Sequence, residues 1–165
     1  MSARADTREH EAKLTLKEAA EYLLEECRMV LPGIQALFGF QLVAVFDSAF
    51  SQDLSLSRQR LHLVAVGLVA CAVAMIMAPA AFHRQTGADR VTSTFVRVST
   101  RLLLWSMAPL AAAICLDFYI LASIIAPRGI AVFCPIVLAA VYVFFWFVLP
   151  RSQRLARLIA GRDQG

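Results

Sequence analysis

Asp117 is a carboxylate inside an otherwise apolar stretch, residues 111–125, and is the side chain best placed to do chemistry in this sequence. It lies about nine residues, or about 13 Å at helical rise, from the end of its apolar run. The same count from the end of the first apolar run reaches Gln41, so we expect the two side chains to lie at one depth. With Gln35 of the same run, they form a candidate polar site.

Two interpretations of Asp117 are open. In the first, it forms a hydrogen bond with Gln41 across two helices and sets their register; such bonds average about 0.6 kcal/mol in membranes. In the second, it lines a hydrated path and exchanges a proton or binds a cation, as ionisable groups inside membranes often do.

A second group of polar residues lies closer to the ends of the apolar runs. Asp47 stands near the end of the first run, His62 near the start of the second, and Arg58 in the short polar linker between them. We expect Asp47, His62 and Arg58 to form a cluster at the outer surface. A pH-sensitive outer gate is one interpretation, because histidine titrates near neutrality. Side chains that simply reach the aqueous interface are the alternative.

A third group flanks the opposite ends of the runs, at the inner boundary. Its members are Glu25, Glu26, Arg28, His83, Arg84 and Arg101. We expect ion pairs among them that anchor the helix ends, with a substrate site as the alternative.

The sequence lacks the patterns of a metal, haem or hydrolase site. His62 and His83 would lie about 31 Å apart along one helix, too far to ligate one haem. No HExxH or GxSxG stretch occurs. The cysteines form no CxxC pair and are expected to be packing residues: Cys27, Cys71, Cys115 and Cys134. We therefore predict no catalytic residue, no metal ligand and no cofactor.

The elements that carry these residues are predicted to be membrane spans. The chain is 59% apolar and 17% charged, against about 45–50% and about 25% in soluble chains. A hydrocarbon core of about 30 Å needs about 20 helical residues. Four runs qualify: residues 29–50, 61–82, 102–126 and 130–149. The predicted fold is an all-α membrane protein, an antiparallel four-transmembrane-helix bundle that occupies residues 29–150.

The segment before the first span has a different character. Residues 1–14 are polar and are expected to be disordered. Thr15 followed by Glu18 forms a capping-box pattern, which predicts that a helix starts there. Residues 15–28 are amphipathic, so we expect a separate N-terminal helix along the cytoplasmic interface that ends in a turn or kink at Pro32.

Basic residues predict the orientation. Thirteen of the sixteen Lys and Arg residues lie on the side of the two termini, which the positive-inside rule assigns to the cytoplasm. Residues 151–165 are then a basic cytoplasmic tail. The basic residues do not form a face with interleaved aromatics, so no nucleic-acid partner is expected.

Three stretches resemble a known family: "RMVLPGIQALFGFQLVAVF", "LSRQRLHL" and "MAPAAFHR". From about residue 25 to residue 150 the chain is similar to an uncharacterised bacterial family of small four-span membrane proteins, a domain of unknown function. The "APAAFHR" ending of the second span is the most recognisable piece. The resemblance implies a four-span fold in a bacterial inner membrane, and it implies no reaction.

These observations lead to two expectations about function. The first is an integral inner-membrane protein without enzymatic activity, acting as an accessory or assembly protein. The alternative is a small proton- or cation-linked transporter or channel subunit that uses Asp117 and Gln41. Four spans enclose little space, so a transport path would need a homo-oligomer or a membrane protein partner within the lipid bilayer.

Overall fold

The computed structural model describes the backbone of residues 2–86 and 92–152, and the side chains of residues 15–48, 50, 52, 54–85 and 92–152. Its elements are α1 (Ser2–Val45), α2 (Ser48–Asp53), α3 (Leu56–Thr86), α4 (Ser93–Ile125), α5 (Arg128–Val143), the π-helical turn η1 (Phe144–Val148) and α6 (Leu149–Arg151). This described part of the chain contains no strand, and the predicted all-α class is confirmed.

Within the residues that the structure describes, four helical segments are long and apolar enough to cross a membrane. They are Thr15–Val45, Leu56–Gln85, Ser93–Ile125 and Arg128–Arg151. The prediction of a four-helix membrane protein is therefore confirmed, although the helix ends differ from the predicted ones by several residues. We call the end of the bundle with the α1–α3 connection and the α4–α5 turn the outer end, and the opposite end the inner end.

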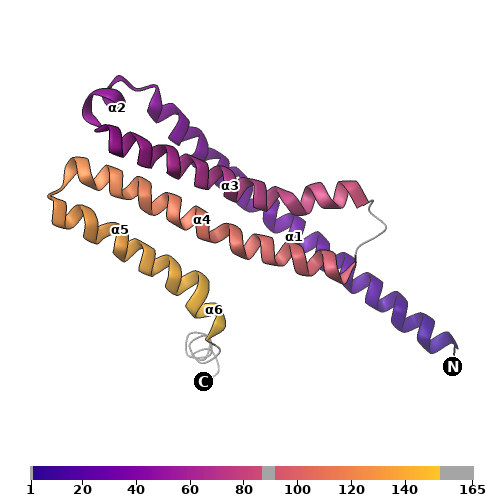
Figure 1. Ribbon diagram of the computed structural model, residues 1–165. Helices are drawn as coiled ribbons and strands as arrows, with labels where there is room; N and C mark the ends of the chain where they lie inside the picture. The colour runs from indigo at the N-terminus through magenta and orange to yellow at the C-terminus, as the bar shows by residue number, and fades with distance from the viewer. Residues whose placement is uncertain (1, 87–91, 153–165) are drawn as a thin grey trace.

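The helices pack in the order α1, α3, α4, α5. α3 and α4 lie antiparallel along their lengths, α5 lies against α4, and α1 crosses α3 and reaches α4 (Figure 1). Ala65 and Val69 of α3 and Ala113 of α4 are completely buried in the core between them. Small side chains at these positions let the helix backbones approach closely, which is how membrane helices gain packing energy.

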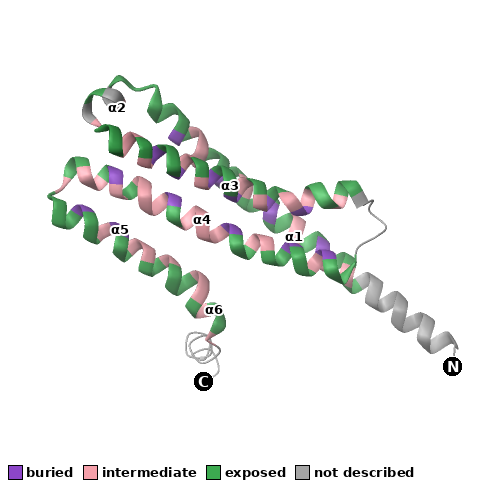
Figure 2. Ribbon diagram, viewed as in Figure 1, coloured by how far each residue is buried: buried purple, intermediate pink, exposed green. Residues whose placement is uncertain are grey.

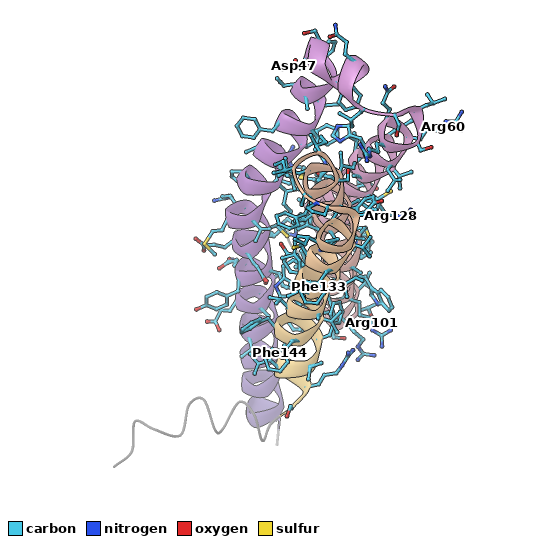
Figure 3. The ribbon with its side chains drawn as sticks, turned by 90° about the vertical axis from the view of Figure 1, so that its left-hand side faces the viewer. Asp47, Arg60, Arg101, Arg128, Phe133 and Phe144 are labelled. Carbon is cyan, nitrogen blue, oxygen red and sulfur yellow. The ribbon has the colours of Figure 1, made fainter. Side chains whose placement is uncertain are left out.

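Many large apolar side chains face away from the bundle. Exposed residues cover the outward faces of the helices, while buried residues lie on the faces between them (Figure 2). Phe133 of α5 is 66% exposed and Phe144 of η1 is 38% exposed. Both belong to the fourth span (Figure 3). An apolar surface of this extent is compatible with hydrocarbon and unfavourable in water.

The N-terminal helix is not a separate element, which corrects the sequence-based prediction. α1 begins at Ser2, so residues 2–14 are helical rather than disordered, and it continues without interruption past Thr15 and Pro32. At about 1.5 Å per residue α1 is about 66 Å long, roughly twice the hydrocarbon thickness. Its N-terminal turns project past the inner ends of the other helices (Figure 1). Residues 2–14 include many strong helix formers, which explains why the helix extends to Ser2.

Two helix ends near the membrane boundary have clear causes. Thr92 caps α4, its side chain accepting a hydrogen bond from the Phe95 backbone N–H at 3.2 Å. Ala126 and Pro127 have extended backbone and form the tight turn between α4 and α5. Of the predicted basic tail, residues 153–165 lie outside the described residues.

Candidate functional site

Three polar residues from three different helices meet near the outer end of the bundle. Gln41 comes from the last turns of α1, His62 from the second turn of α3, and Asp117 from the outer half of α4. Gln41 is 4% exposed and His62 is 7% exposed, whereas the Asp117 side chain retains 25% exposure. We call Gln41, His62 and Asp117 the intramembrane triad.

The triad is joined by three contacts. Gln41 Nε2 donates a hydrogen bond to Asp117 Oδ2 at 2.5 Å. His62 Nδ1 lies 3.3 Å from Asp117 Oδ1, the distance of an ion pair. His62 Nε2 lies 2.9 Å from the backbone oxygen of Gln41. Asp117 therefore contacts both other side chains, and His62 connects α3 to both α1 and α4.

The contacts of His62 fix one ring tautomer and place the second ring nitrogen beside a carboxyl group. A backbone carbonyl can only accept, so the Nε2 that faces Gln41 must carry hydrogen. Nδ1 then faces Asp117 either as the N–H of an imidazolium or as a bare nitrogen that accepts from a protonated carboxyl. In both forms the His62–Asp117 pair is neutral overall. Without that proton the carboxylate would keep the Gln41 hydrogen bond but would face a nitrogen lone pair, which is unfavourable in an apolar environment.

Two oxygen atoms of the triad have capacity for a further ligand. Gln41 Oε1 and Asp117 Oδ1 are buried and accept no hydrogen bond from any described residue. The His62 contact to Oδ1 has ion-pair distance without the direction of a hydrogen bond. Each oxygen can accept from a water molecule or contact a cation, since buried acceptors without partners are unfavourable.

The connection between α1 and α3 shapes the outer side of the triad. α1 ends at Val45, and α2 folds over the outer end before α3 begins at Leu56 (Figure 1). Phe50 of α2 meets the His62 ring edge to face, with ring centroids 5.2 Å apart at an angle of 64°. This aromatic contact orients the imidazole and covers it on the outer side.

Gln35 does not join the triad. It is exposed on α1, six residues before Gln41. Six residues rotate a helix by about 600°, which directs the two side chains to different faces. The meeting of Gln41 and Asp117 expected from depth is present, and Gln35 lies outside it.

His62 belongs to the triad and not to an outer cluster with Asp47 and Arg58. Both of its ring nitrogens contact Gln41 or Asp117, while Asp47 is exposed beyond the end of α1 and Arg58 is half-buried. Figure 3 shows Asp47 at the tip of the outer end. The sequence-based grouping was wrong for His62 because the predicted span ends were wrong.

Correct span ends would have allowed the sequence to predict that His62 lies at the depth of Gln41. Gln41 lies four residues before the end of α1, and His62 lies six residues after the start of α3. With spans ending at Val45 and starting at Leu56, these two residues have similar depths. The predicted ends at residues 50 and 61 made His62 look shallow.

The inner-boundary residues do not pair as expected. Within the described part of the chain, no ion pair joins Glu25, Glu26, Arg28, His83, Arg84 and Arg101 to one another. Arg101 is exposed on α4 (Figure 3). The anchoring ion pairs predicted from the sequence are therefore replaced by charged groups that line cavities or face outward.

Charged side chains line two of the cavities at the inner half of the bundle. One of about 360 Å³ lies between α1 and α4, where Glu26 and Trp146 are among its lining residues. The other, of about 290 Å³, lies between α1 and α3 and is lined in part by Arg28, His83 and Arg84. The side chains described by the structure contain no cluster of three His, Cys, Asp or Glu residues able to hold a metal ion.

The fold and the intramembrane triad define a multi-pass membrane protein with four spans. The chain belongs to a family of unknown function, DUF6328, whose model matches residues 9–150, and the expected membership of such a family is confirmed. Comparisons with curated proteins and with solved structures found no match.

Proposed function

We propose that this protein is a proton-linked transport or channel subunit, in which the intramembrane triad binds and releases one proton. We further propose a bacterial inner membrane as its location, with both termini in the cytoplasm. The observation that carries the proposal is the 3.3 Å contact between His62 Nδ1 and Asp117 Oδ1.

The geometry favours proton exchange over a purely structural bond. A hydrogen bond between Gln41 and Asp117 would be enough to join α1 to α4, and it needs no titratable partner. The addition of His62, with its second nitrogen fixed on a carbonyl, supplies a second proton acceptor next to the carboxyl. An acid and a base at contact distance are the elements of a proton relay.

One member of the triad also remains partly accessible. Gln41 and His62 are buried, whereas a quarter of the Asp117 side chain remains accessible. The unpartnered oxygens, Gln41 Oε1 and Asp117 Oδ1, could bind a water that delivers the proton. A continuous path across the membrane would then require a second copy or a partner, because four spans leave little interior space.

Proton flux into liposomes that contain the purified protein tests the proposal. A pH-sensitive dye inside the liposomes reports flux driven by an imposed potential. Asp117→Asn and His62→Gln should each lower the flux at least about tenfold, because each removes one of the two groups that share the proton. Asp47→Asn changes an exposed carboxylate at the same end of the bundle and should leave the flux within about twofold.

Flux that is unchanged in Asp117→Asn and His62→Gln would exclude the triad as the proton site. If the folded wild-type protein carries no flux and both variants unfold more easily, the triad only joins helices. The accessory or assembly role would then be the better proposal.

A further inference from the structure

The cavity of about 290 Å³ between α1 and α3 has an amphipathic lining. Its apolar lining residues include Leu31 of α1 and Ile76 and Met77 of α3, and its basic lining residues, which we call the rim, are Arg28, His83 and Arg84. His83 and Arg84 belong to the last turn of α3, so the polar rim lies at the inner end of a membrane span. The cavity is at the opposite end of α3 from the intramembrane triad.

The basic side chains of this rim are not neutralised by acidic ones. Arg28 and Arg84 are exposed, and no carboxylate of a described residue lies within 4.0 Å of either guanidinium. Glu25 and Glu26 are the nearest acidic residues along α1, and Glu26 lines the other cavity, beside α4. Two guanidinium groups therefore remain available to an anion.

The third basic group on the rim is held in place by an aromatic neighbour. His83 is half-buried, and its ring centroid lies 6.0 Å from that of Phe95 on α4. Phe95 is itself buried and stacks on Phe82 with centroids 5.5 Å apart. This aromatic contact positions the His83 ring, so the rim does not consist of long flexible side chains alone.

The lining residues determine which class of ligand fits the cavity. Guanidinium groups bind phosphate oxygens through paired hydrogen bonds. A free phosphate ion would gain nothing from the apolar interior, whereas the acyl chain of a lipid would cover it. A zwitterionic headgroup would also bring a cationic group into a rim that is already positive. An anionic phospholipid satisfies both parts of the cavity, and basic pockets between spans bind such headgroups.

We infer that this cavity binds an anionic phospholipid, with the phosphate between Arg28 and Arg84 and an acyl chain along Leu31, Ile76 and Met77. The bound lipid would connect the inner ends of α1 and α3. It would thereby fill the space between residues 24–31 of α1 and residues 76–84 of α3. This inference does not depend on the proposed proton binding, which involves other residues at the other end.

Native mass spectrometry of the full chain in detergent tests the inference. Phosphatidylglycerol and phosphatidylcholine with matched acyl chains are added at equal concentration, and lipid-bound species are counted. The wild-type protein should bind phosphatidylglycerol about tenfold more tightly or better, given the contribution of each arginine near a charged headgroup. The double variant Arg28→Ala with Arg84→Ala should lose this preference.

The matched control removes two arginines from the outer end, Arg60→Ala with Arg128→Ala. Both residues are exposed and neither lines the cavity, so the preference for phosphatidylglycerol should be retained. Substitution of both cavity arginines by lysine keeps the charge but loses paired hydrogen bonding, and should give an intermediate affinity. Thermal unfolding of each variant verifies that it is folded.

Three results would overturn the inference. The first is an unchanged preference in the folded double alanine variant. The second is an equal loss of preference in the outer-end control, which would indicate attraction by overall charge. The third is displacement of phosphatidylglycerol by inorganic phosphate at similar concentration, which would indicate a free-anion site with no role for the acyl chain.

Discussion

His62 Nδ1 lies 3.3 Å from Asp117 Oδ1, so a residue of the second turn of α3 contacts a carboxylate in the outer half of α4. The other ring nitrogen of His62 is engaged by the backbone of Gln41 on α1. A single imidazole therefore connects three helices, and its protonation is linked to the packing among them. This linkage is the basis of the proposed function.

Replacement of Asp117 should destabilise the bundle in a way that depends on the substituted side chain. Asp117→Ala leaves the buried Gln41 amide without its acceptor and removes the ion-pair contact of His62, so we expect a loss of about 1–3 kcal/mol in the free energy of unfolding. Asp117→Asn keeps an oxygen that can accept from Gln41 and should cost less. Equilibrium unfolding in mixed detergent measures both variants.

Leu121→Ala serves as the control for this measurement. Leu121 is 52% exposed on the same helix. Its substitution should change the free energy of unfolding little, because lipid or detergent contacts this side chain in both the folded and the unfolded state. Equal losses for the alanine and asparagine variants of Asp117 would contradict the importance of the Gln41 hydrogen bond.

Ala65 should tolerate no larger side chain. It is completely buried between α3 and its neighbours, so Ala65→Leu would overpack the interface at a cost of about 1–3 kcal/mol. Ala70 is exposed on the same helix, and Ala70→Leu should change stability by less than about 0.5 kcal/mol. Thermal unfolding compares the two, and a similar midpoint for both variants would place Ala65 at the lipid surface instead.

Cysteine labelling tests the expected orientation. In a background in which the four native cysteines are replaced by alanine, Ser57→Cys probes the outer end and Ser93→Cys the inner end, since both serines are exposed. A membrane-impermeant maleimide should label Ser57→Cys in intact cells, and Ser93→Cys only after permeabilisation. The reverse pattern would show that the positive-inside rule does not hold for this chain.

Much of the fold could be predicted from composition and run length. Four apolar runs were sufficient to predict four spans, because each contains enough residues to cross the hydrocarbon core. The predicted ends of the spans were less accurate than their predicted number. α1 continues through Pro32 as one helix, because in a membrane neighbouring helices and local adjustments can compensate for the hydrogen bond that proline removes.

The fourth span also contains a feature that sequence reasoning did not predict. Residues Phe144–Val148 form a π-helical turn, in which the Leu149 N–H bonds to the Phe144 oxygen. Such a turn depends on local hydrogen-bond geometry near Pro150, which provides no N–H. It positions Trp146 to line the cavity beside α1 and α4.

The sequence by itself determined that this chain partitions into lipid and that Asp117 and Gln41 could meet, because partition and depth depend on composition and on distance along a helix. Only the tertiary structure decided that His62 joins them, that Gln35 faces elsewhere and that Arg28 shares a cavity with Arg84. These outcomes depend on how the helices rotate and cross. Rotation and crossing are set by close packing of residues such as Ala65, Val69 and Ala113 between distant segments, which local sequence does not specify.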